Sequence, residues 1–203
     1  FIIYPADVAG ITNNINDPAA NLDLPGAYAS QGFPALDYLL NAIGAGDDAI
    51  LTLYTTDPDA EKRLAYVTRT TQRMSALLTK VVEEWKGSYR EIFIGKTGLD
   101  IGSSTGLVVN AYVLYYERYV RSGKIGIPSG AAIGGNTGEP HPEKVEAYYK
   151  KDISLSLART AHEAARDFFN GKSASSETEG PSFKSYLDAL GARDPASDKM
   201  LSE

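Results

Sequence analysis

The fold of this chain is decided by residues 57–86, which have the sequence DPDAEKRLAYVTRTTQRMSALLTKVVEEWK. Side chains suited to a helix interface recur there at three- and four-residue spacing, and this spacing predicts a long amphipathic bundle helix. Asp57 and Pro58 predict its start, with the aspartate as N-cap and the proline at the first helical position. The stripe consists of Leu64, Val67, Thr71, Met74, Leu77, Leu78, Val81, Val82 and Trp85.

A second long helix is predicted downstream, capped by Ser103 or Ser104 and closed by Ser122 and Gly123. Four tyrosines at i, i+3, i+4 and i+7 positions share one face of this helix. A tyrosine face of this kind is more typical of bundle packing than of a ligand platform, although it could also stack on a sugar or meet a partner domain. These tyrosines are Tyr112, Tyr115, Tyr116 and Tyr119.

The remaining chain has helical periodicity and no strand alternation of useful length, so the predicted fold class is all-α. Turn-forming residues are spread over residues 1–30 and predict an ordered but irregular segment. Further helices are predicted at Gly32–Ile43, Pro142–Tyr149, Ile153–Asn170 and Ser182–Leu190.

The glycine distribution suggests a division into helical units. We expect residues 1–123 to form a first helical bundle unit, incomplete at its N-terminus. Residues 124–142 form a Gly-rich crossover too irregular for a helix, and residues 143–203 begin a second helical bundle unit.

Composition excludes several classes of function. The chain has 26 acidic and 20 basic residues and a net charge of −6, which disfavours nucleic acid as a partner because phosphate binding needs a concentrated basic surface. It has no cysteine, which rules out disulfides, thiolate catalysis and cysteine-ligated metals within it. No apolar stretch approaches the roughly 20 residues needed to cross a bilayer.

Residues 32–40, Gly-Phe-Pro-Ala-Leu-Asp-Tyr-Leu-Leu, contain the strongest candidate site. The stretch resembles the imelysin-like family of bacterial envelope proteins, whose motif Gly-x-His-x-x-Glu lies in a helix that continues into Tyr-Leu-Leu. Gly32 and Tyr38 match this pattern. Pro34 stands where the family has histidine and Asp37 where it has glutamate, so the motif is degenerate.

A histidine and a glutamate three positions apart lie on one face of a helix and can reach one cation or one water molecule. Pro34 offers neither a nitrogen ligand nor a general base, and it favours the first helical turn. Asp37 keeps a carboxylate on a shorter side chain. We therefore interpret Asp37 as a solvated or hydrogen-bonded helix residue, and assign no catalytic residue and no metal ligand.

Other motifs fail on spacing. Gly95-Lys96-Thr97 lacks the upstream glycine of a phosphate-binding loop, because Arg90 occupies that position. His162-Glu163 lacks the second histidine of a zinc-peptidase helix, since that position is Arg166. His141 lies between two prolines near Glu139 and Glu143, in what we interpret as a solvated loop.

A second stretch supports the resemblance. Residues 123–128, followed by residues 139–149, resemble the passage between the two domains of imelysin-like proteins. Membership of that family implies two helical bundles with a site between them, a place in the bacterial envelope, a link to iron uptake and a peptidase label. Because family members are longer at both ends, we expect an interior portion of a longer protein, truncated at both ends.

From the resemblance we predict a non-catalytic binding or accessory protein associated with iron uptake, periplasmic or lipid-anchored through a missing N-terminus. Iron or zinc are the metals that the resemblance would allow. One alternative is a metallopeptidase of the imelysin type. The second is a glycan- or protein-binding module that uses Tyr116 or the loop at 126–141. In every case we expect the remaining portion of the same protein, or a companion chain, to cover the helices at 64–85 and 107–119.

Overall fold

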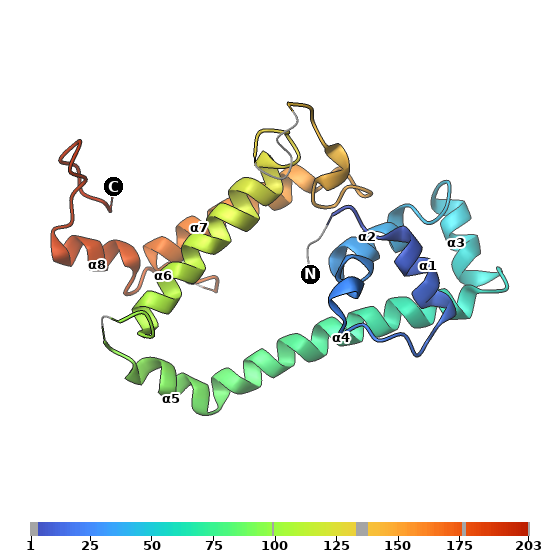
Figure 1. Cartoon of the computed structure of the whole chain (residues 1–203), viewed down its shortest axis with the longest axis horizontal. Helices are drawn as coiled ribbons and strands as arrows, with labels where there is room; N and C mark the ends of the chain where they lie inside the picture. The colour runs from blue at the N-terminus through green and yellow to red at the C-terminus, as the bar shows by residue number, and fades with distance from the viewer. Residues whose placement is uncertain (1–3, 99, 133–137, 176–177, 203) are drawn as a thin grey trace. The chain divides into compact units, whose positions relative to one another are not determined.

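The computed structural model describes residues 4–98, 100–132, 138–175 and 178–202 (Figure 1). Their regular structure is helical, and the β pairing among them consists of two isolated bridges, Lys172 with Glu179 and Arg193 with Met200. The expected all-α class is thus confirmed. The chain divides into two compact units, Phe1–Leu155 and Ser156–Glu203. The division around residues 124–142 stays a prediction.

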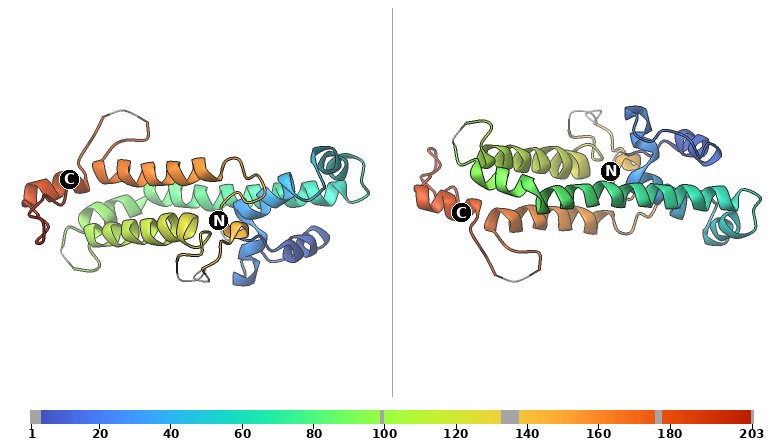
Figure 2. Two further views of the ribbon diagram at one scale, coloured as in Figure 1. Left: turned by 90° about the horizontal axis from the view of Figure 1, so that it is seen from above. Right: turned by 90° about the horizontal axis from the view of Figure 1, so that it is seen from below.

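The first unit is built on the longest helix, α4 (Ala60–Lys86), which confirms the helix predicted from residues 57–86. Among the shorter helices that contact α4 are α1 (Val8–Asn16), α2 (Gly32–Asn41) and α3 (Asp47–Thr55). They gather around its N-terminal half in all views (Figures 1 and 2). The core between them contains Ala6, Ile11, Leu22, Ala35, Leu39 and Tyr66.

Sequence reasoning missed four short helices. The segment expected to be irregular contains α1 and a 3-10 helix at Pro25–Ser30. The side chain of Asp7 caps α1 by accepting a hydrogen bond from the Gly10 N–H, and Ile11 is fully buried. Helix α3 follows Gly46 and helix α5 (Ser88–Gly95) follows Gly87, and neither was predicted. Such short helices depend on tertiary packing more than on their own periodicity.

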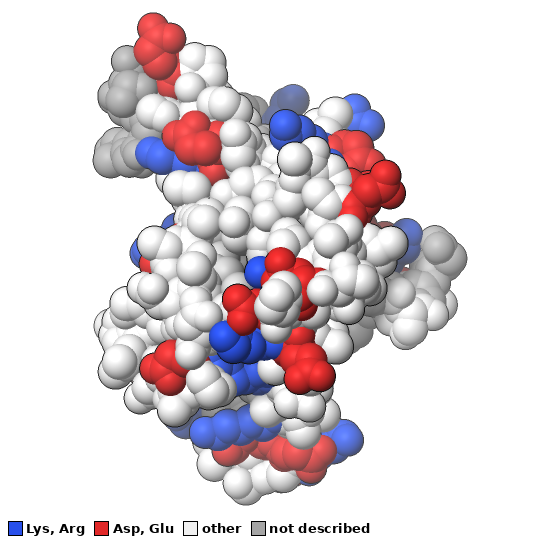
Figure 3. Space-filling view, turned by 90° about the vertical axis from the view of Figure 1, so that its right-hand side faces the viewer, with Lys and Arg blue, Asp and Glu red and all other residues white. Residues whose placement is uncertain are grey.

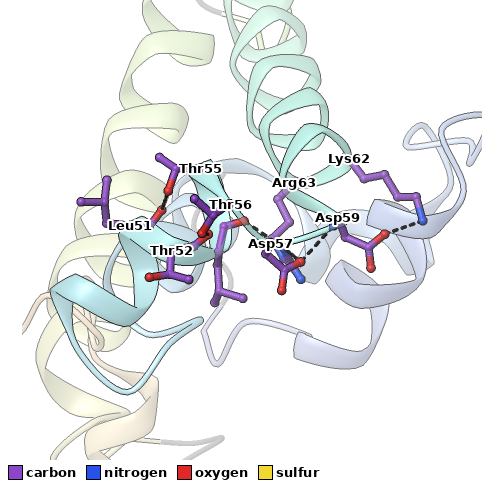
Figure 4. A network of polar contacts seen from close by, with 9 residues as sticks. Leu51, Thr52, Thr55, Thr56, Asp57, Asp59, Lys62 and Arg63 are labelled. Atoms are coloured by element: carbon purple, nitrogen blue, oxygen red, sulfur yellow. Dashed lines mark hydrogen bonds and ion pairs between the residues drawn. The ribbon is translucent and has the colours of Figure 1, made fainter.

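The start of α4 differs from the prediction (Figure 4). The helix begins at Ala60 with Asp59 as N-cap, two residues later than expected. Oδ1 of Asp57 accepts hydrogen bonds from the Asp59 N–H at 2.9 Å and from Nη1 of Arg63 at 2.7 Å, and Arg63 also donates to the Leu53 carbonyl at 2.9 Å. Asp57 therefore closes the turn between α3 and α4 instead of capping α4. The hydrogen bond from Arg63 lowers the pKa of the Asp57 carboxyl.

Helix α6 (Ser104–Leu114) begins where predicted, because Oγ of Ser103 accepts the Gly106 N–H at 3.1 Å. It continues into a π-helix, Tyr115–Gly126, so the predicted closure at Ser122 and Gly123 is wrong. Wider turns of this kind, with i→i+5 hydrogen bonds such as Ile127 N–H to the Ser122 carbonyl at 2.8 Å, change which side chains share a face.

The helix predicted at Pro142–Tyr149 is also wrong. A 3-10 helix covers Pro142–Lys144 and turns follow. Ala147 and Lys151 have positive φ angles of 56° and 65°, which no α-helix accommodates.

Helix α7 (Ser154–Asn170) follows these turns. Both α7 and α8 (Phe183–Leu190) agree with the helices predicted at Ile153–Asn170 and Ser182–Leu190. Ser182 caps α8, and Gly191 ends it in the left-handed conformation at φ 60°. The rings of Phe168 and Phe183 join α7 to α8 with centroids 5.9 Å apart. Within the parts of the chain that the structure describes, no helix combines the length and apolarity of a membrane span.

Candidate functional site

Asp37, the surviving acidic residue of the motif, lies on α2 and is 9% exposed. Its carboxylate faces a segment more than a hundred residues further along the chain. Oδ2 accepts the Tyr149 N–H at 2.9 Å and Oδ1 accepts the Lys150 N–H at 2.9 Å. Nδ2 of Asn41 also donates to Oδ1 at 3.2 Å. Each carboxylate oxygen therefore already has a backbone N–H donor.

We call residues 145–151 the strap, because this segment crosses α2 and is held there. Its backbone is folded so that two successive N–H groups point at one carboxylate, which is the geometry of a backbone anion nest. The Lys151 N–H closes the turn on the Ala147 carbonyl at 2.7 Å. The positive φ angles of Ala147 and Lys151 flank this turn, and non-glycine residues adopt them only where surrounding contacts impose the conformation.

Aromatic residues add to the attachment of the strap. The Tyr4 hydroxyl donates a hydrogen bond to Oδ2 of Asp37 at 3.5 Å. Burial raises the pKa of the Tyr4 phenol, and the nearby Asp37 charge raises it further. The ring of Tyr38, one residue after Asp37, meets the ring of Tyr149 edge to face at 5.4 Å. Burial also raises the pKa of Tyr149.

An ion pair holds the strap from the side of the π-helix. Nζ of Lys124 pairs with the carboxylate of Glu146, and their side chains are only 10% and 15% exposed. Removing one member of such a buried pair leaves an uncompensated charge, so the pair fixes the position of the strap even where its net contribution to stability is small. The strap is thus held by α2 at Tyr149 and Lys150 and by Lys124 at Glu146.

Gly32 and Pro34 shape the start of α2. Gly32 is buried and has a φ angle of 74°, a conformation that favours glycine, so this position tolerates little else. Pro34 lies in the first turn of α2, as predicted, and is fully buried. Its ring therefore occupies core space at the position where the resemblance placed a histidine.

Comparison with known proteins agrees with this assignment of the motif. The imelysin family model, which carries the peptidase M75 label, matches residues 4–201. The chain belongs to the imelysin family. No curated protein and no solved structure matches it significantly.

The motif residues of this imelysin-family chain do not fit a metal. Two N–H groups point their positive ends at the oxygens of Asp37, where a cation would have to bind, and Pro34 contributes no donor atom. Across the described parts of the chain, no group of three or more histidine, cysteine, aspartate and glutamate side chains is arranged to hold a metal ion. His141 contacts Glu143, with Nδ1 3.3 Å from Oε1, and His162 lies on α7.

Tyr116 lies on the π-helix and belongs to a different element from the motif residues. Tyr112 and Tyr116 are half-buried whereas Tyr115 and Tyr119 are exposed. Burial raises the pKa of Tyr112, and Tyr116 raises it further. The four tyrosines of the predicted face therefore divide into a half-buried pair and an exposed pair.

Sequence reasoning singled out Asp37 and a stretch that ends at Tyr149, but not the contact between them and not Lys150. Residues 139–149 were recognised by their likeness to an interdomain passage, and Asp37 by the degenerate motif. Nothing in the local sequence connects positions separated by 112 and 113 residues. Every residue except proline has a backbone N–H, so the residue types at positions 149 and 150 do not show that their N–H groups act as donors.

Proposed function

We propose that this chain is a non-catalytic binding or accessory protein of the bacterial cell envelope, associated with iron uptake, in which the imelysin motif has become a structural anchor. One observation carries the first part of this proposal: the two oxygens of Asp37 bind the N–H groups of Tyr149 and Lys150. The envelope location, periplasmic or lipid-anchored, and the link to iron uptake rest on the family likeness.

The chemistry of the anchor argues against a catalytic Asp37. A general base must reach the proton that it abstracts, either directly or through one water molecule. The carboxylate of Asp37 is buried and already accepts backbone hydrogen bonds. Hydrogen bonds to a charged group contribute about 1.5–3 kcal/mol each, so opening the site for a substrate or a metal would forfeit several kcal/mol.

A metallopeptidase is the alternative that the family label suggests. Such an enzyme needs a metal-bound water or a comparable activated nucleophile. Pro34 supplies no ligand, and Asp37 could supply one only after the strap had left α2. A peptidase reading therefore predicts that metal binding and strap opening occur together.

An interaction module is the second alternative, and the surface of the first unit favours it. Helix α6 is apolar on every side, yet none of its residues is buried. Leu107, Val113 and Leu114 are 44%, 52% and 52% exposed. A helix that is apolar all round is ordinarily covered. We propose that a companion polypeptide, or another portion of the same protein, packs against it.

The surface charge is consistent with a protein partner. On the face drawn in Figure 3, basic and acidic side chains lie interspersed and form no extended basic field. A mixed surface of this kind suits protein contacts better than a phosphate backbone. Binding of a glycan through Tyr116 would be detected as saturable binding that the Tyr116→Ala variant loses.

The deciding experiment is metal titration of the wild type, the Asp37→Ala variant and a matched Asp48→Ala control, whose aspartate is exposed on α3. Iron and zinc contents are measured by elemental analysis, and binding by calorimetry. We expect no stoichiometric binding that depends on Asp37 and no chelator-sensitive peptide cleavage. Stoichiometric metal binding that is lost specifically in Asp37→Ala, together with peptide cleavage by the wild type, would contradict the structural role of Asp37 and support the metallopeptidase alternative.

A genetic experiment tests the accessory role separately. We expect expression of the gene to rise when iron is scarce, and growth of a deletion strain to fall under the same limitation. An Asp37→Asn allele that retained folded protein should restore growth, because the proposal assigns that residue no chemistry. Growth and expression independent of iron supply would contradict the iron-uptake part.

A further inference from the structure

A cavity of about 310 Å³ lies between the C-terminal end of α1 and the first half of α4, away from the strap. Its volume is at the lower end of small-molecule sites in proteins. Much of its wall is apolar, formed by Ile15, Pro18, Ala65 and the ring of Tyr66, while polar groups enter from both helices. The polar residues lining it are Asn14, Asn16, Glu61, Lys62 and Arg69.

Arg69 is the unusual member of this lining. Its guanidinium donates to backbone carbonyls at the end of α1, through Nη1 to Pro18 and through Nη2 to Asn14 at 3.2 Å, and it lies 5.2 Å from the centroid of the Tyr66 ring. Nε is buried and has no hydrogen-bond acceptor among the residues that the structure describes. A buried donor without an acceptor is uncommon in folded proteins and points to a missing partner.

The charge of Arg69 is also incompletely compensated. Arg63 pairs with Asp57 at 2.7 Å and Arg73 pairs with Asp23 at 2.6 Å, whereas no carboxylate of the described chain lies within ion-pair distance of Arg69. The carbonyl end of α1 supplies only about half of one negative charge. Lys62 adds a second cation at the cavity, although it is paired with Asp59 at 2.7 Å.

We infer that this cavity binds a small organic monocarboxylate with an apolar body. The carboxylate accepts hydrogen bonds from the guanidinium of Arg69, whose Nε–H has no acceptor among the described residues. The apolar body of the ligand lies against Ile15, Pro18 and Tyr66. Glu61 at the same cavity disfavours a second negative charge on the ligand.

The test is a titration of the ¹⁵N-labelled 203-residue chain with benzoate, followed by NMR, with benzamide as the uncharged match. We expect saturable amide shifts in residues 14–18 and 61–69 with benzoate, and much weaker shifts with benzamide. Arg69→Gln should weaken benzoate binding at least about tenfold, since it removes charge-assisted hydrogen bonds. Arg121→Gln, which alters an exposed arginine paired with Glu117 at 2.5 Å, is the control and should bind as the wild type.

A second variant separates loss of binding from loss of structure, because Arg69→Gln also removes hydrogen bonds to the end of α1. Ala65→Leu fills the cavity from an exposed helical position and leaves the Arg69 contacts in place. We expect this variant to keep the thermal stability of the wild type and to lose benzoate binding. No saturable binding, equal binding of benzamide, or unchanged binding in Ala65→Leu would each overturn the inference.

Discussion

The two halves of α4 have opposite surroundings, and the face buried in the first half is not the predicted stripe, whose Leu64 is 56% exposed. In the first half Tyr66 and Thr70 are buried beneath α1 and α2, with exposures of 2% and 0%. In the second half no residue is buried, and Leu78, Val81 and Val82 are 60%, 54% and 46% exposed. The apolar spacing continues through both halves. An amphipathic pattern therefore shows that a face needs a partner, but not where along the chain that partner comes from.

The same contrast separates the anchored and open parts of the first unit. The core around α1, α2 and the strap contains polar groups that find partners over long sequence distances, as Asp37 does with the N–H groups of Tyr149 and Lys150. Helices α5 and α6 contain no buried residue. We therefore expect the stability of the unit to reside in the first region and its capacity for association in the second.

The sharpest test of this comparison is a matched pair of leucines. Leu39 on α2 is fully buried, and Leu78 on the second half of α4 is 60% exposed. We expect Leu39→Ala to lower the free energy of unfolding by about 2–5 kcal/mol, because it leaves a cavity in the core. Leu78→Ala should change it by less than about 1 kcal/mol. Chemical denaturation of both variants measures the difference, and equal losses would show that the second half of α4 is covered in solution.

The next largest effect concerns the strap. Asp37→Asn keeps the size of the side chain but places an amide against two N–H donors, so we expect a loss of about 2–3 kcal/mol in the free energy of unfolding. Faster hydrogen exchange at the Tyr149 and Lys150 amides should accompany it. Asp48→Asn is the matched control on an exposed position. Unchanged exchange at both amides in Asp37→Asn would contradict the anchor.

Tyr4 gives the anchored region a response to alkaline pH. Its pKa is raised in the folded chain, so the folded state holds the phenol proton more tightly than the unfolded state. The resulting stabilisation is fully present below the ordinary tyrosine pKa of about 10 and is lost as the pH rises from there through the folded pKa. Tyr4→Phe should lower stability at neutral pH by about 0.5–1.5 kcal/mol and flatten the alkaline loss, as measured by denaturation at several pH values. If Tyr4→Phe and the wild type lose the same amount of stability at alkaline pH, the loss comes from other tyrosines and not from Tyr4.

The smallest effect is expected at the exposed turn before α4. Arg63 lowers the pKa of Asp57, so this pair contributes stability above the ordinary aspartate pKa of about 4, and the contribution disappears as the pH falls through the folded pKa. In Arg63→Gln, NMR titration of the Asp57 carboxyl should show its pKa moving up toward the ordinary value. Lys62→Gln, which breaks the neighbouring ion pair with Asp59, should leave the pKa of Asp57 unchanged.

Local sequence determined the features that depend on neighbouring residues. The stripe of residues 57–86, the cap at Ser103, and Ser182 with Gly191 at the ends of α8 produced the predicted elements, because helix periodicity and capping act within a few residues. The degenerate motif was equally visible, since Pro34 and Asp37 replace particular residue types. The all-α class followed from these patterns together.

Only the tertiary structure decided what those residues contact. It showed that Asp37, interpreted from the sequence as a solvated or hydrogen-bonded helix residue, anchors the strap. It folded residues 145–151 with left-handed residues where a helix was predicted, and it placed Arg69 against the carbonyl end of α1. The physical reason is common to all three. Buried polar groups must find partners wherever the chain brings them, and partners more than fifty or a hundred residues apart obey no local spacing rule.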